Sequence, residues 1–103
     1  MIDAKNKILE HFGTIDGLLN AAGGNLPGAT IQPDDNLFDA SLSDTFKSIE
    51  LNLHGTMIPT HVFGRVIAEK GAGSIVNISS LAASRSITRV LGYTVTKHGI
   101  SSY

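Results

Sequence analysis

The sequence predicts an α/β protein built around a parallel β-sheet. Two short apolar runs, at residues 15–20 and 74–79, have the length and composition of buried strands. Between them lies a segment, residues 44–70, in which apolar residues recur close to the period of an α-helix. Two strands joined by a helix form a βαβ unit, whose right-handed crossover makes the strands parallel.

The first two predicted elements are a helix and a strand. Residues 2–12 place four large apolar side chains near one helical face, and Gly13 follows as a helix stop. The apolar run that ends at Asn20 predicts a buried strand. The small residues at 21–24 then predict a loop that another group approaches closely.

The middle of the chain is predicted to be a loop followed by a long helix. Residues 25–41 are rich in Pro, Gly, Asp and Asn, which predicts a loop with a short helical turn at 37–40. Ser43 is the expected cap of the next helix. That helix extends over 44–70 as one segment, with a kink expected at Pro59.

The last elements are a strand, a loop and a helix. The glycines of the segment 71–73 end the long helix, and the β-branched residues of 74–79 predict the second strand. Residues 80–91 are small and polar, which predicts a loop. The last helix is expected to start near Gly92 or Tyr93 and to continue to the end of the sequence.

A chain of 103 residues allows one small domain. We expect residues 1–103 to form a single partial domain, because a parallel sheet needs both faces covered and usually more than two strands. The pattern therefore predicts a part of a larger protein.

The composition argues against several classes of function. The net charge is −1 without a long run of one sign, so neither a nucleic-acid-binding patch nor a polybasic membrane anchor is expected. The chain has no cysteine, no apolar stretch of about 18 residues and no signal-peptide core, so we expect a cytoplasmic protein. His54 and His61 would lie about 10 Å apart along their helix. That distance is too long for a shared ion, and no metal site is expected.

Four polar residues are spaced along the chain in a way that indicates a catalytic site. Tyr93 and Lys97 are four residues apart in a predicted helix, so their side chains share one face. Ser80 comes 13 residues before Tyr93, and Asn52 lies in the long helix. The motifs NAAG (20–23), ELNLHG with Asn52, IVNISS (75–80) and YTVTK (93–97) resemble, in order and spacing, the short-chain dehydrogenase/reductase family over residues 1–103.

The resemblance implies a partial Rossmann-type, doubly wound parallel sheet and an NAD- or NADP-dependent oxidoreductase. Tyr93 would be the general acid/base that exchanges a proton with the substrate oxygen, and a lysine ammonium one turn away favours the phenolate. Lys97 would also bind the nicotinamide ribose. Ser80, which keeps the 13-residue interval that Ser79 does not, would hydrogen-bond the reacting oxygen. Asn52 would hold a water for proton relay.

The resemblance also implies cofactor contacts and missing parts. The residues expected to contact NAD(P) are Asn20, Ala21, Ala22, Gly23, Ile78, Tyr93 and Lys97. No glycine-rich phosphate-binding turn is found, since GGNLPG (23–28) has the wrong spacing and no helix after it. The chain therefore resembles a central fragment that lacks the N-terminal phosphate-binding βαβ and the C-terminal part of the family fold.

A narrower resemblance concerns the substrate. The segments NAAGGNLPGAT, ELNLHGTMIPTHVFG and SLAASRSITRV are similar to the D-mannonate oxidoreductase (fructuronate reductase) branch, which implies a sugar acid. Arg85 and Arg89 lie in the loop before Tyr93, where a guanidinium would pair with a carboxylate. Each arginine taken alone is more simply a solvated loop residue. Family members usually form dimers or tetramers, so a homo-oligomer is expected of the full-length parent.

Two alternatives stay open at this stage. The chain is either part of a working oxidoreductase or a truncated, non-catalytic remnant that at most associates through its long helix. An epimerase or dehydratase relative would share the Tyr/Lys pair, but the 13-residue serine interval argues against it.

Overall fold

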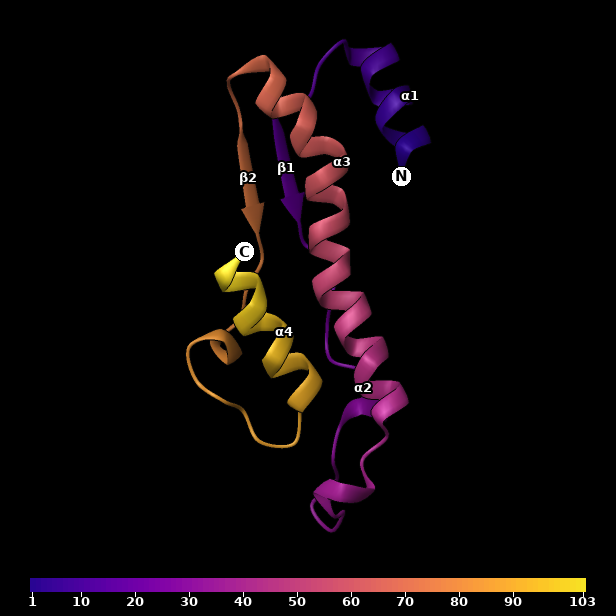
Figure 1. Cartoon of the computed structure of the whole chain (residues 1–103), viewed down its shortest axis with the longest axis vertical. Coiled ribbons are helices and arrows are strands. Elements are labelled where there is room, and N and C mark those ends of the chain that lie inside the picture. The colour runs from indigo at the N-terminus through magenta and orange to yellow at the C-terminus, as the bar shows by residue number, and fades with distance from the viewer. The chain divides into compact units, whose positions relative to one another are not determined.

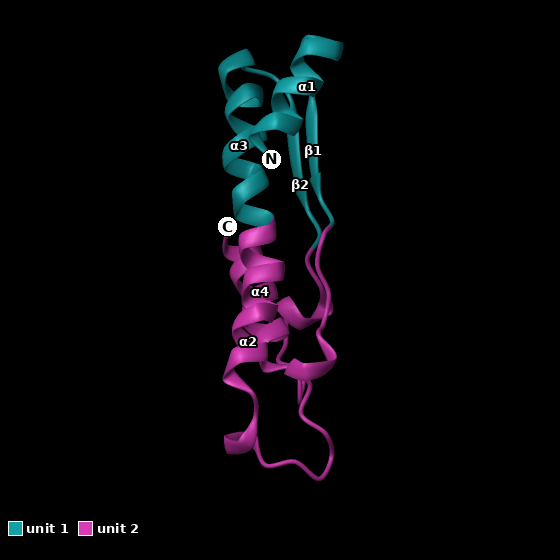
Figure 2. Cartoon of the chain, turned by 90° about the vertical axis from the view of Figure 1, so that its right-hand side faces the viewer, with its two compact units in different colours: residues 1–21, 56–78 teal, residues 22–55, 79–103 magenta.

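The computed structural model describes all residues, 1–103, and divides them into two compact units (Figure 2). The first unit comprises residues 1–21 and 56–78, and the second comprises residues 22–55 and 79–103. No helix is both long and apolar enough to span a membrane.

The first unit holds a helix, a pair of strands and most of a second helix (Figure 1). These elements are α1 (Ile2–Phe12), β1 (Gly17–Asn20), α3 (Gly55–Lys70) and β2 (Ser74–Asn77). The strands pair in parallel, with Gly17 opposite Ser74 and Asn20 opposite Asn77. The predicted βαβ unit with parallel strands is confirmed. So are the helix ends at Gly13 and Gly71, whose φ angles are 77° and 76°.

The expectation that both strands are buried is wrong. Leu19 and Val76 pair across the strands and remain 61% and 51% exposed. On the opposite face α3 approaches closely, since a Cβ added to Gly64 would lie 3.1 Å from Cδ1 of Ile75. Side chains alternate between faces along a strand. A sheet of only two strands with one helix against one face therefore leaves the other face open.

The second unit consists of short helices and loops. Its elements are η1 (Pro27–Ala29), η2 (Leu37–Asp39), α2 (Leu42–Ile49), η3 (Glu50–His54), η4 (Leu81–Ala83) and α4 (Leu91–Ser102). The predicted turn near residue 37 and the start of the last helix near residue 92 are both confirmed. Helices α2 and α4 pack closely, because a Cβ on Gly92 would lie 3.1 Å from the Thr45 carbonyl oxygen.

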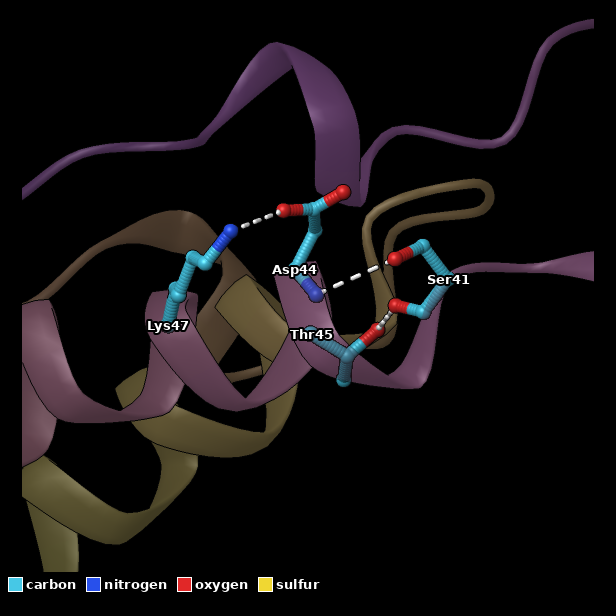
Figure 3. Close-up of polar contacts among 4 residues, drawn as sticks. All are labelled: Ser41, Asp44, Thr45 and Lys47. Carbon is cyan, nitrogen blue, oxygen red and sulfur yellow. Dashed lines mark hydrogen bonds and ion pairs between the residues drawn. The ribbon is translucent and has the colours of Figure 1, made fainter.

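The cap of α2 is Ser41, so the expectation of Ser43 is wrong (Figure 3). The Ser41 hydroxyl accepts a hydrogen bond from the backbone N–H of Asp44 at 3.2 Å. Its backbone carbonyl accepts another from Oγ1 of Thr45 at 2.9 Å. A cap is the residue whose side-chain oxygen reaches the N–H two or three positions on. Ser41 does this, and Ser43 lies already inside the helix.

The segment predicted as one helix with a kink at Pro59 is interrupted elsewhere. Residues Glu50–His54 form a π-helical turn, η3, between α2 and α3, and α3 stays α-helical on both sides of Pro59. A π turn holds one more residue than an α turn and has no sequence signature as strong as proline. The periodicity of the apolar residues therefore did not reveal it.

Candidate active site

Helix α4 brings Tyr93 and Lys97 onto one face, as predicted. The ammonium nitrogen of Lys97 lies 5.6 Å from the centroid of the Tyr93 ring. Lys97 is only 6% exposed and Tyr93 is half-buried. The small residues of this helix allow the burial, since Gly92 and Thr96 are themselves buried where α4 packs on α2 and η3. The lysine charge is thereby kept beside the phenol ring.

Ser80 sits at the start of η4, a turn that packs against α4. Its backbone is extended, and its hydroxyl accepts a hydrogen bond from the N–H of Ala82 at 3.1 Å. Ala82 is completely buried. The cap thus holds the Ser80 hydroxyl on a turn that contacts the helix of Tyr93 and Lys97.

Asn52 lies at the centre of η3 and is completely buried. Its Oδ1 accepts a hydrogen bond from the N–H of Gly24 at 2.9 Å. Its Nδ2 donates to the carbonyl of Gly24 at 2.9 Å and to that of Ser48 at 2.8 Å. Nδ2 of Asn52 thus donates to two backbone carbonyls. The side chain holds the glycine loop onto the helix.

Gly23 is the point of closest approach in this loop. It has a φ of 153°, and a Cβ there would lie 2.6 Å from Oδ1 of Asn52. The sequence predicted a close approach at 21–24 but not its partner. Gly24 and Ser48 were missed as partners of Asn52, because an asparagine in a helix carries no sign of the loop it contacts.

Three of the expected cofactor residues, Asn20, Ala21 and Ile78, lie in the first unit. Asn20 is 6% exposed, and its Nδ2 donates to Oγ1 of Thr60 at 2.9 Å and to Oδ1 of Asn77 at 2.8 Å. Its backbone carbonyl accepts from the N–H of Ile78 at 3.0 Å. Ala21 and Ile78 are exposed. Asn20 therefore connects the C-terminal ends of both strands to each other and to Thr60 within α3. The sequence did not predict Thr60 and Asn77 as partners of Asn20. The available signal was that Asn20 and Asn77 each end a strand.

Arg85 and Arg89 lie in the loop between η4 and α4 and are both exposed. Neither guanidinium forms an ion pair in the structure. The Arg89 backbone is left-handed, with φ of 67°, and its carbonyl accepts the N–H of Ile31 at 2.9 Å. The loop is thus tied to the segment after η1, while both cationic groups remain available to an anion.

The loop that follows Ala21 exposes a stretch of backbone with very small side chains. Ala22 and Gly23 are exposed and carry no side chain larger than a methyl group, and the next residue, Gly24, is held by Asn52. A backbone that is both bare and held in place lets a flat ring or ribose come close.

No group of three His, Cys, Asp or Glu residues that could hold a metal is found.

Solved structures of known proteins match the fold over nearly the whole chain. A structure provisionally described as a D-mannonate oxidoreductase from Haemophilus influenza, with bound NAD, is 37% identical with a TM-score of 0.83. The match covers 98% of this chain and 40% of that one. ElxO with NADP bound is 30% identical (TM-score 0.85), and NAD+-bound xylitol dehydrogenase is 25% identical (TM-score 0.86). These two matches cover 98% of this chain and 38% and 36% of theirs. The predicted α/β, Rossmann-type class is confirmed.

Sequence relatives agree with the structures. An uncharacterized oxidoreductase from Haemophilus influenzae is 34% identical over 98% of this chain and 39% of its own length. D-threitol dehydrogenase from Mycolicibacterium smegmatis is 33% identical over 94% of this chain and 35% of its length. The chain thus spans about 40% or less of these relatives. The family model described as short chain dehydrogenase matches residues 1–103. The chain belongs to the short-chain dehydrogenase family.

Proposed function

We propose that this chain carries the proton-transfer part of an NAD- or NADP-dependent oxidoreductase that interconverts a hydroxyl and a keto group of a sugar acid. Residues 1–103 would then be one partial dinucleotide-binding domain. The observation that carries the proposal is the pair on α4. Lys97 is buried with its ammonium nitrogen 5.6 Å from the Tyr93 ring centroid, and the turn that begins at Ser80 packs on the same helix.

The chemistry assigned to the residues follows from their groups. In the reductive direction the Tyr93 hydroxyl gives its proton to the carbonyl oxygen, and the Lys97 ammonium stabilises the phenolate left behind. The Ser80 hydroxyl donates a hydrogen bond to the same oxygen. NAD(P)H, when bound, supplies the hydride that reaches the carbonyl carbon. Asn52 keeps the loop of Ala22 and Gly23 in place beside this chemistry.

A sugar acid such as D-mannonate or fructuronate is the proposed substrate. The support is the provisional description of the related Haemophilus structure, together with the two unpaired guanidinium groups of Arg85 and Arg89. A guanidinium binds a carboxylate through two parallel hydrogen bonds. A homo-oligomeric parent, a dimer or tetramer, is part of the same proposal.

The test is oxidation of NADH or NADPH by the protein in the presence of fructuronate. Tyr93→Phe keeps the ring but removes the acid, so we expect the rate to fall by about 100-fold or more. Tyr103→Phe is the matched control, because Tyr103 is the only other tyrosine and lies at the end of α4. Turnover by Tyr93→Phe at the wild-type rate contradicts the proposal.

A second candidate is a chain that has no activity alone and only associates with a partner. The open face of the two-stranded sheet and the span of about 40% of the relatives favour it. Circular dichroism and NADH titration of the chain separate the two candidates. A cooperative melting transition with saturable NADH binding argues for the oxidoreductase, and the absence of both argues for the associating chain.

A further inference from the structure

A third residue extends the face of α4 that carries Tyr93 and Lys97. Ser101 follows Lys97 at the same interval of four residues, and residues four apart are neighbours on a helix surface. The Ser101 hydroxyl oxygen lies 2.9 Å from the hydroxyl oxygen of Ser79, and either can donate the hydrogen bond. Ser79 directly precedes Ser80, so this face of α4 contacts the residue next to Ser80.

The turn of Ser80 is thereby held at two points. After Ser80, the hydrogen bond from the Ala82 N–H to the Ser80 hydroxyl fixes the start of η4. Before Ser80, the pair of Ser79 and Ser101 fixes the backbone to the last turn of α4. Both hydrogen bonds lie within the second unit. Of the two, the Ser79–Ser101 hydrogen bond is the one that links this turn to the helix of Tyr93.

We propose that Ser101 is a positioning residue, which through Ser79 sets the distance between the hydroxyl of Ser80 and that of Tyr93. This inference rests on the proposed function of Ser80 and Tyr93. The Ser79–Ser101 hydrogen bond is exposed, and water can replace it there, so it contributes little to stability. We expect it to act on the position of the Ser80 hydroxyl, because small misplacements of reacting groups lower reaction rates steeply.

A cross-linking experiment tests the geometry without reference to activity. The chain has no cysteine, so Ser79→Cys/Ser101→Cys introduces the only two thiols. We expect oxidised glutathione to accept the two hydrogens and leave an intramolecular disulfide in this variant, detected by loss of both free thiols without a glutathione adduct or a second chain in the mass. Ser79→Cys/Ser102→Cys is the control, because Ser102 lies about 100° further round the helix. Equal disulfide yields in the two variants overturn the proposal.

The role in catalysis is tested by kinetics. Ser101→Ala should lower kcat by roughly two- to tenfold, the range that one neutral hydrogen bond allows. The KM for NADH and the unfolding midpoint should not change, and Ser101→Thr should restore kcat because it keeps the hydroxyl. An unchanged kcat in Ser101→Ala overturns the positioning role, and so does a lack of rescue by Ser101→Thr.

Tyr93→Phe, measured alongside, separates this inference from the proposed function. If Tyr93→Phe is inactive while Ser101→Ala turns over normally, only the positioning role fails. If Tyr93→Phe turns over like the wild type, the proposed function fails and the positioning role fails with it.

Discussion

At Gly23 the backbone takes a φ of 153°, and a Cβ would lie 2.6 Å from Oδ1 of Asn52. Gly23→Ala therefore has to displace the Asn52 amide, which holds Gly24 through two hydrogen bonds. We expect Gly23→Ala to destabilise the chain by about 2 kcal/mol, measured by urea unfolding, and to weaken NADH binding.

The neighbouring glycine is the control for that change. No atom lies within 4 Å of a Cβ built on Gly24, and its φ is not left-handed. The hydrogen bonds of Gly24 to Asn52 use only backbone atoms, so Gly24→Ala keeps them. We expect Gly24→Ala to change stability by less than about 1 kcal/mol. Equal effects at the two glycines would show that the contact with Asn52 is not the cause.

For single residues, the sequence predicts which side chains are neighbours within one helix, but not which distant residues they contact. The pair of Tyr93 and Lys97 could be predicted from a spacing of four, because a helix makes such residues neighbours whatever surrounds them. The contact of Asn52 with Gly24 crosses 28 residues. It depends on a π turn, whose extra residue per turn changes which side chains face inward.

Among the elements, α2 has a carboxylate at its first turn that responds to pH. A hydrogen bond from Lys47, at 2.9 Å, holds the pKa of Asp44 below its ordinary value of 3.8, with help from the Ser41 hydroxyl and the Lys47 charge (Figure 3). A folded-state pKa below the unfolded one stabilises the folded form above about pH 4. That contribution is lost as the pH falls below 3.8 toward the folded-state value.

Thermal unfolding followed by circular dichroism tests this dependence. Asp44→Asn should unfold at a lower temperature than the wild type at pH 7, and the difference should shrink below about pH 4. The difference is expected to be small, because Lys47 is 63% exposed and water screens the pair. Asp34→Asn, at an exposed loop carboxylate with no hydrogen bond, should show no such pH-dependent difference. A constant difference from pH 2 to 7 would contradict the assignment.

The boundaries of α2 show why helix starts are hard to predict. Ser41 and Ser43 are the same residue type two positions apart, so composition does not distinguish them. The structure selects Ser41, because only from there does the hydroxyl reach the N–H of Asp44. A Cβ on Gly28 would lie 2.8 Å from Oδ2 of Asp44, so the short helix η1 also constrains this end of α2. That contact joins residues 16 apart in the sequence.

For the whole molecule, the family and the βαβ unit could be predicted, because four motifs keep their order along the chain and the strand–helix–strand pattern is local. The burial of the strands could not be predicted, because a strand is buried only by the elements that pack on it. Leu18 and Leu19 read alike in the sequence. In the structure Leu18 is half-buried in a groove with Ile8 and Phe63, whereas Leu19 is 61% exposed.

This contrast leads to a prediction about the open face of the sheet. Leu19→Lys should change the free energy of unfolding of the chain by no more than about 0.5 kcal/mol, because its side chain already lies in water. Leu18→Lys should cost clearly more, because the lysine would enter the apolar groove. Urea unfolding of both variants makes the comparison.

Light scattering over a range of concentrations then shows whether the open face drives association. An exposed apolar strand face promotes it, so Leu19→Lys should lower the apparent mass if the wild type self-associates. If Leu19→Lys unfolds the chain as readily as Leu18→Lys, another surface covers Leu19 in solution, and the open sheet is then a face that a second copy or further strands occupy. The proposed partial domain predicts tolerance of Leu19→Lys in the chain alone and loss of stability wherever the sheet is covered.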